Sequence, residues 1–217
     1  MRLAQLHQLL RNEGVPARVL EAPAPVQDDE QRRWRARLAG RLTELSAQGA
    51  SATLTWVVGL IREAQQAHEP AAWVASSQRC FFPPDLASSG VDLAALPVVH
   101  APDVTAAARA AEKLVKSGAF GLVVLDLDRA PTLSMPLQSR LTVLAQTHDT
   151  AVVCLTQKPA VAPSIGSLVS LRAEAKRTRL GPGRYDVELE VVKDKRQGPG
   201  ARSHEVCHAP AGMGSVG

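Results

Sequence analysis

The sequence contains few aromatic residues, few cysteines and no long apolar segment. Aromatic residues make up 3% of the 217 residues although 45% are hydrophobic, so a core must consist mainly of leucine, valine and alanine. The three cysteines have no paired spacing, which disfavours a disulfide framework and indicates a reducing compartment. No apolar stretch approaches the roughly 20 residues that span a bilayer, and the first residues lack the apolar segment of a signal peptide. We therefore expect a cytoplasmic protein without membrane contact.

Charge and histidine content add weaker constraints. A net charge of +4 and a pI near 9.2 favour acidic partners only mildly. The six histidines have no metal-like spacing, so no metal site is expected. The length suffices for one sizeable α/β domain with additional segments, but not for two such domains.

Residues 1–30 are predicted to form a short amphipathic helix followed by a flexible linker. Leu3, Leu6, Leu9 and Leu10 share one helical face. A helix this short is unstable alone in water, so it must pack either on its own domain or on a neighbouring molecule. The linker is rich in proline and is expected to be extended.

A basic cluster follows the linker and surrounds one aromatic residue. It consists of Arg32, Arg33, Trp34, Arg35 and Arg37. One interpretation is a solvated helix face whose indole packs inward. The alternative is a nucleic-acid contact, with the guanidinium groups on phosphates and the indole stacking on a base.

Residues 31–208 are predicted to form one α/β domain with a mainly parallel sheet flanked by helices. Short apolar runs alternate with helical patterns, which is typical of this fold class. From Ser167 the pattern changes to period two with Gly-Pro-Gly turns, which predicts a C-terminal antiparallel meander. The tail, residues 209–217, is expected to be disordered. The predicted strands are 41–46, 71–75, 96–100, 121–126 and 151–155, and the predicted main helices are 53–66, 103–116 and 134–146.

The central predicted strand, residues 121–126, closes on Asp126. Its four consecutive branched aliphatic residues suit a strand buried on both faces. An acid at the carboxyl end of such a strand lies in the crevice where open α/β sheets bind ligands. In nucleotide triphosphatases such an acid helps to hold Mg²⁺.

The segment before helix 53–66 has the strand, loop and helix order of a phosphate-binding loop but lacks its chemistry. Such a loop needs several glycines, a lysine for the phosphates and a hydroxyl residue for Mg²⁺. Here Gly49 is the only glycine, and Ser51 and Ala52 precede Thr53 where a lysine is needed. We therefore expect no bound nucleotide cofactor and no ATPase activity, with Asp126 a structural remnant.

Several stretches together resemble the core of the RecA recombinase, over roughly residues 38–208. This resemblance implies a RecA-like fold in which Lys193 and Lys195 reach across a filament interface toward the neighbouring nucleotide. It also implies an N-terminal helix that packs on the adjacent protomer. The matching stretches are Gly40–Leu45, Ser89–Val99, Leu122–Asp126 and Glu190–Lys195.

The chain departs from active recombinases at several positions. Ser77 stands where the family carries the glutamate that activates water. The two DNA-binding loops, which correspond to residues 128–135 and 158–166, are cut back. The residues of the family's functional set that remain are Asp126, Gln157, Lys193 and Lys195.

A RecA-like core without ATPase residues is similar to the ImuA group of bacterial proteins, which are relatives of RecA also linked to the SulA-like division inhibitors. The resemblance implies a non-catalytic, nucleoid-associated accessory of SOS-induced translesion synthesis that binds RecA and the polymerase-like ImuB. Two alternatives stay open. One is a residual nucleotide switch using Thr53 and Asp126, and the other is weak sequence-independent DNA binding by the basic cluster and by residues 172–202. Self-association is left open as well.

Overall fold

The computed structural model describes residues 36–48, 52–76, 83–129 and 132–208, all within one compact unit. The predicted N-terminal helix with its four leucines, residues 32–35 of the basic cluster and the predicted disordered tail therefore lie outside the described residues.

The described strands form one eight-stranded sheet in the order β3-β2-β4-β5-β1-β6-β7-β8. Neighbouring strands pair in parallel from β3 to β6, whereas β7 and β8 are antiparallel. This arrangement confirms the predicted mainly parallel sheet with a C-terminal antiparallel extension. The strands are β1 Arg41–Ala47, β2 Ala71–Ser76, β3 Val98–Ala101, β4 Leu122–Arg129, β5 Ala151–Gln157, β6 Leu171–Gly181, β7 Arg184–Asp194 and β8 Arg202–His208.

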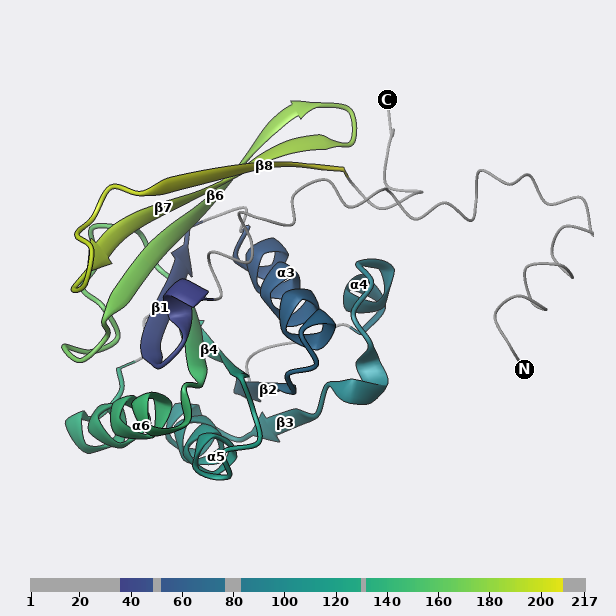
Figure 1. Ribbon diagram of the computed structural model, residues 1–217. Helices are drawn as coiled ribbons and strands as arrows, with labels where there is room; N and C mark the ends of the chain where they lie inside the picture. The colour runs from purple at the N-terminus through teal and green to yellow at the C-terminus, as the bar shows by residue number, and fades with distance from the viewer. Residues whose placement is uncertain (1–35, 49–51, 77–82, 130–131, 209–217) are drawn as a thin grey trace, which may run out of the picture. The chain divides into compact units, whose positions relative to one another are not determined.

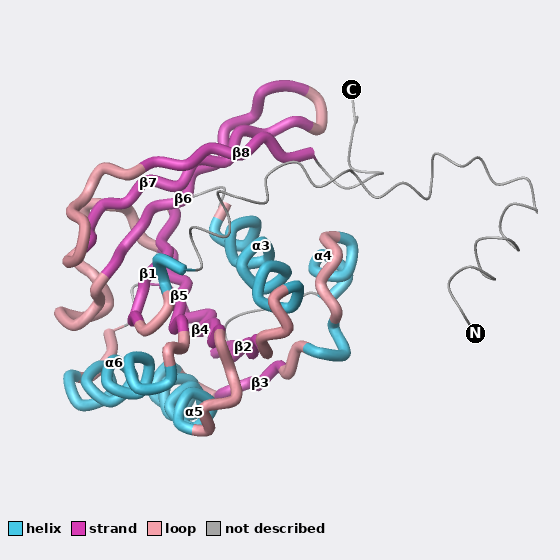
Figure 2. Tube along the Cα trace, viewed as in Figure 1, coloured by secondary structure: helices cyan, strands magenta, loops and turns pink. Residues whose placement is uncertain are grey.

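Helices cover both faces of the parallel part of the sheet (Figures 1 and 2). Helix α3 (Thr53–Gln66) packs on one face, where its apolar side chains share a core with alternate residues of the strands. Helices α5 (Val104–Lys116) and α6 (Met135–His148) cover the other face and enclose a second core. The short helix α4 (Pro83–Ser88) and the 3₁₀ helix η2 (Leu93–Ala95) lie between β2 and β3 in sequence.

The ends of α5 follow from its capping residues. The carboxylate of Asp103 accepts a hydrogen bond from the backbone N–H of Ala106 at 2.7 Å, which caps the N-terminus. After Lys116 the chain leaves the helix through Gly118, whose φ of +69° suits a residue without Cβ. The predicted helix 103–116 is thus confirmed nearly residue for residue.

The buried face of α3 differs from the predicted one. The helical spacing of its apolar residues predicts an inward face of Leu54, Val57, Val58 and Ile61, but Leu54 is 46% exposed. The buried face instead includes Trp56, whose large side chain removes more apolar surface from water than the leucine would.

The C-terminal meander is continuous with the central sheet. The sequence pattern predicted an antiparallel strand from about residue 168, but β6 begins at Leu171 and pairs in parallel with β1. Residues of β6 and β7 also join the core that contains α3, and the three strands arch over that helix (Figure 1). The meander is therefore part of the same folded unit.

Candidate functional site

The β1–α3 junction occupies the place of a phosphate-binding loop. Helix α3 begins directly after Ala52, which is buried and whose methyl group cannot cap the helix. No residue from 48 to 53 is a lysine. Thr53 is buried at the first position of the helix, whereas Gly49 and Ser51 lie outside the described residues.

Asp126 lies deeper in the sheet than the sequence suggested. Strand β4 continues three residues beyond it to Arg129, so the carboxylate is not at the strand end. Asp126 is opposite Leu155 of β5, and Leu155 is opposite Leu45 of β1. Asp126 therefore lies level with a residue that is two positions before the end of β1. By alternation it shares the α3 face of the sheet with Val124, and it is 2% exposed. Thr53 and Asp126 therefore face the same side, as in a nucleotide site, but the acid is buried.

Lys193 and Lys195 lie in another part of the molecule. Lys193 is directly opposite Arg172 near the start of β6, and Arg172 is in turn opposite Glu44 in the middle of β1. Lys195 follows the end of β7, and its Nζ donates to the carbonyl of Ser167 at 2.7 Å. Within one chain, the two lysines are thus not brought together with Thr53, which follows the opposite end of β1.

A buried charged cluster on the face opposite α3 escaped the sequence analysis. The carboxylate of Glu44 accepts hydrogen bonds from the hydroxyl of Thr156 at 2.8 Å and from the N–H of Ile165 at 3.0 Å. It also forms an ion pair with Lys158 Nζ at 2.7 Å, and the Nε of Arg172 lies 3.9 Å away. All of these side chains are buried, so the charges are compensated within the protein.

The buried cluster holds the loop that the resemblance assigned to DNA binding. Arg172 donates to the carbonyl of Pro159 at 2.7 Å and also to that of Ala162. Lys158 donates to the carbonyl of Pro163 at 2.6 Å. The lysine at the start of this loop is therefore engaged internally and does not offer its charge to a phosphate backbone.

A second buried ion cluster joins the start of β1 to the end of β7. The carboxylate of Asp194 accepts from Arg41 at 2.7 Å and from Arg37 at 2.9 Å. Burial alone would raise the pKa of Asp194, but the hydrogen bonds from Arg41, the backbone N–H of Arg196 and Arg37 outweigh it and hold the pKa well below its usual range. Arg37, the described member of the basic cluster, thus has an acidic partner within the chain.

The two described cysteines show no sign of reactivity. Burial, followed by the charge of Glu44, strongly raises the pKa of the Cys154 thiol. Burial and nearby carboxylates raise the pKa of Cys207 to about 11. Cys154 lies in the core, as the apolar run Ala151–Leu155 around it predicts.

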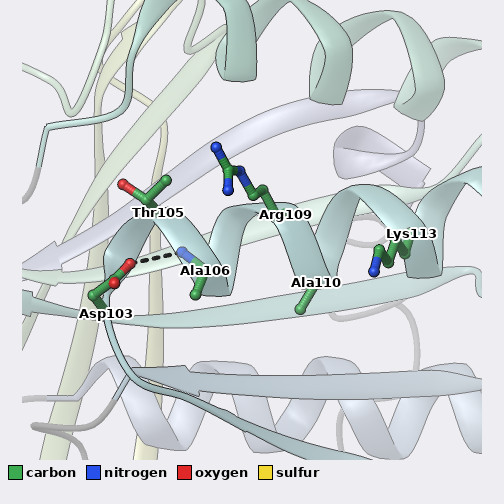
Figure 3. Close-up of a pocket in the computed structure, with 6 residues that line it drawn as sticks. All are labelled: Asp103, Thr105, Ala106, Arg109, Ala110 and Lys113. Carbon is green, nitrogen blue, oxygen red and sulfur yellow. Dashed lines mark hydrogen bonds between the residues drawn. The ribbon is translucent and has the colours of Figure 1, made fainter.

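A hollow lies along α5, from its capping residue Asp103 to Lys113 (Figure 3). Its volume is about 340 Å³, and its lining residues come from α5 and its cap alone. Arg109 and Lys113 supply the cations of this lining, and no other described element contributes a residue to it. The lining residues are Asp103, Thr105, Ala106, Arg109, Ala110 and Lys113.

The described residues contain neither a metal-binding cluster nor a membrane-spanning helix. No group of three or more histidine, cysteine, aspartate or glutamate side chains there is placed to hold a metal ion. Within the same ranges, none of the helices has the length and apolar character that a bilayer crossing requires.

Comparison with known proteins identifies the architecture. A crystal structure of the RadB recombinase matches over 77% of this chain and 87% of its own, with a TM-score of 0.58 and 15% sequence identity. The chain has a RecA-like fold. No family model and no curated sequence matches the chain.

Glu44 and Arg172 are charged residues within β1 and β6, whose sequences alternate polar and apolar side chains. Alternation alone does not distinguish a solvated charge from a buried one. Because β1 is covered on both faces, a charged residue in it must find an internal partner. The position of Ser77, where an active recombinase would carry its glutamate, lies outside the described residues.

Proposed function

We propose that this chain is a non-catalytic RecA-like accessory protein of SOS-induced translesion synthesis. In this proposal it binds RecA, the polymerase-like ImuB, or both, and damps RecA-dependent recombination. It works as an interaction protein without ATP turnover and uses the RecA-like surfaces as binding surfaces.

The observation that carries the proposal is a RecA-like fold whose β1–α3 junction lacks phosphate-binding chemistry. Ala52 supplies neither a charge nor a cap where a nucleotide-binding helix needs a lysine. A charge-assisted hydrogen bond of the kind that this lysine makes contributes about 1.5–3 kcal/mol. Losing it, together with most loop glycines, removes the basis for holding a triphosphate, while the rest of the fold is kept.

The test measures RecA-catalysed strand exchange and ATPase activity on single-stranded DNA while the full chain is titrated in. We expect inhibition below stoichiometric amounts, because a protein that caps a filament end affects many RecA protomers. Pull-downs with purified RecA and purified ImuB at low salt accompany the titration.

Two variants locate the contact. Replacing Leu6 and Leu9 together by glutamate removes the predicted apolar face of the N-terminal helix and should abolish inhibition. The double substitution Lys113→Ala and Lys116→Ala, on the exposed side of α5, is the control and should inhibit like the wild type. If neither RecA nor ImuB is retained above background, the proposal is wrong.

A further inference from the structure

The loop between β5 and β6 presents an exposed apolar tip. Residues Pro159–Pro163 form five consecutive residues without a polar side chain. Val161 at the centre of this tip is 94% exposed. A side chain so apolar and so accessible gains free energy when another surface covers it.

Hydrogen bonds fix the backbone of this tip. The N–H of Ala162 donates to the carbonyl of Pro159 at 3.0 Å, which closes a turn around Val161. Arg172 binds the carbonyls of both turn ends, and the N–H of Ala160 donates to the carboxylate of Glu174 at 3.1 Å. Buried charges therefore hold the backbone on either side of Val161, and a partner meets a surface that is already ordered.

Two cations lie along the β5–β6 connection that carries the tip. Lys193 is directly opposite Arg172 across the β6–β7 ladder, and such partners project from the same face of a sheet. Lys193 therefore lies on the same face of the sheet as Arg172, which binds the loop that carries Val161. Lys195, two residues further on, is exposed and contacts the carbonyl of Ser167 in the same β5–β6 connection.

Lys193 has no acidic partner at hydrogen-bond distance among the described residues. Burial, the charge of Lys195 and the charge of Arg172 lower its pKa, and only Glu44 opposes them. Glu44 is already engaged by Lys158 and by hydrogen bonds. A carboxylate from outside the chain would therefore relieve the repulsion around Lys193.

We propose that the 158–166 loop tip, together with Lys193 and Lys195, is a docking surface for an acidic protein segment that carries an apolar anchor residue. The anchor packs against Val161, and carboxylates of the segment pair with the two lysines. The inference rests on the proposed function, because it names the chemistry by which the partner is recognised.

A protein segment fits this surface better than nucleic acid. DNA binding draws its affinity from several phosphate contacts by lysine and arginine. The loop offers no free cation, since Lys158 is buried and paired with Glu44. One exposed apolar tip and two lysines suit an acidic protein segment, whose apolar anchor residue covers the tip and whose carboxylates pair with the lysines.

The experiment measures binding of the full chain to an array of peptides of about 12 residues that tile the sequences of RecA and ImuB. Binding to intact RecA and ImuB is measured in parallel. The variants are Val161→Asp, which adds a repelling charge at an exposed site, and the double substitution Lys193→Ala and Lys195→Ala. We expect the bound peptides to be acidic with an apolar residue, and each variant to weaken them by about tenfold or more.

Matched controls separate the surface from general effects of charge. Val143→Asp places the same charge at a valine that is 56% exposed on α6. Lys113→Ala with Lys116→Ala removes two lysines from α5. Both controls should bind the peptides within about twofold of the wild type.

The outcomes distinguish this inference from the proposed function. If intact RecA or ImuB binds but the array yields no acidic peptide, or the Val161→Asp variant binds as well as the wild type, the docking surface is wrong and the proposed function stands. If acidic peptides bind in a Val161-dependent way while neither intact partner does, only the proposed function falls. If the same variants instead weaken binding to single-stranded DNA of about 30 nucleotides and leave the peptides unaffected, the occupant is nucleic acid and the inference is overturned.

Discussion

Asp194 connects two distant parts of the chain through a side chain that is fully buried. It binds Arg41 at the first residue of β1 and Arg37 just before it. Both bonds depend on the ionised carboxylate, whose pKa is lowered in the folded protein. A lowered folded pKa means that this contribution is present above the ordinary carboxyl pKa of about 4 and is lost as the pH falls below it.

The first prediction concerns Asp194→Asn. The variant should lose about 3–5 kcal/mol of unfolding free energy at neutral pH, because it leaves Arg41 buried without a counter-charge. Chemical denaturation measures the difference, which should shrink as the pH falls below about 4 because the wild type then loses the same interaction. The control Asp186→Asn changes a half-exposed aspartate and should shift stability by no more than about 0.5 kcal/mol. Equal effects of the two substitutions would contradict this assignment.

Gly166 packs directly against a buried amide. A Cβ built on Gly166 would lie 2.1 Å from the side chain of Gln138. That side chain cannot move away freely, since it donates to the carbonyl of Leu133 at 2.6 Å and accepts from the N–H of Leu168 at 3.0 Å. The glycine therefore permits the close approach of the β5–β6 connection to α6.

We accordingly expect Gly166→Ala to lower the unfolding free energy by about 1–3 kcal/mol, the usual cost of overpacking. Combining it with Gln138→Ala should cost less than the sum of the two single changes, because the amide that clashes is gone. Gly181→Ala serves as the control, since a Cβ there meets nothing within 4 Å. Additive effects in the double variant would mean that the clash is not the cause.

At the scale of elements, the β5–β6 connection is held by buried charges as well as by the buried side chains of Ile165 and Val169. Glu44 and Lys158 form its central pair, and both side chains are at most 5% exposed. Removing one partner of such a pair leaves a buried uncompensated charge, whereas removing both leaves none.

The third prediction is therefore a double-mutant cycle. Glu44→Gln and Lys158→Met should each destabilise the protein by about 3–5 kcal/mol, and the double variant should lose less than the sum. Limited proteolysis should cut the 158–166 loop faster in the single variants than in the wild type. Lys113→Met, at an exposed lysine on α5, is the control and should change neither measurement.

At the scale of the whole molecule, a RecA-like fold without a phosphate-binding lysine should be indifferent to nucleotide. A ligand at about 100 times its Kd stabilises a folded protein by about 2.7 kcal/mol, which thermal unfolding detects readily. We predict no rise in Tm with about 1 mM ATP and Mg²⁺. A rise that depends on ATP concentration and disappears in Asp126→Ala would instead support the nucleotide switch.

Much of the architecture could be predicted because it depends on local patterns. The capped helix after Asp103 and the apolar runs of β4 and β5 are readable from periodicity and capping residues alone. The absent lysine before Thr53 is likewise a fact of sequence, and so is the apolar run around Val161.

The sequence by itself thus determined the order and type of the main elements and the absence of a lysine before Thr53. Only the tertiary structure decided that β6 joins the parallel sheet. It also decided that Glu44 of β1 pairs with Lys158 after β5, and that Arg172 lies opposite Lys193. Such pairings bring together residues far apart in the chain, and a residue carries no local sign of the distant partner it will find. Whether a charged residue is solvated or buried against a partner depends on which strands flank it, and that is settled only when the whole sheet has formed.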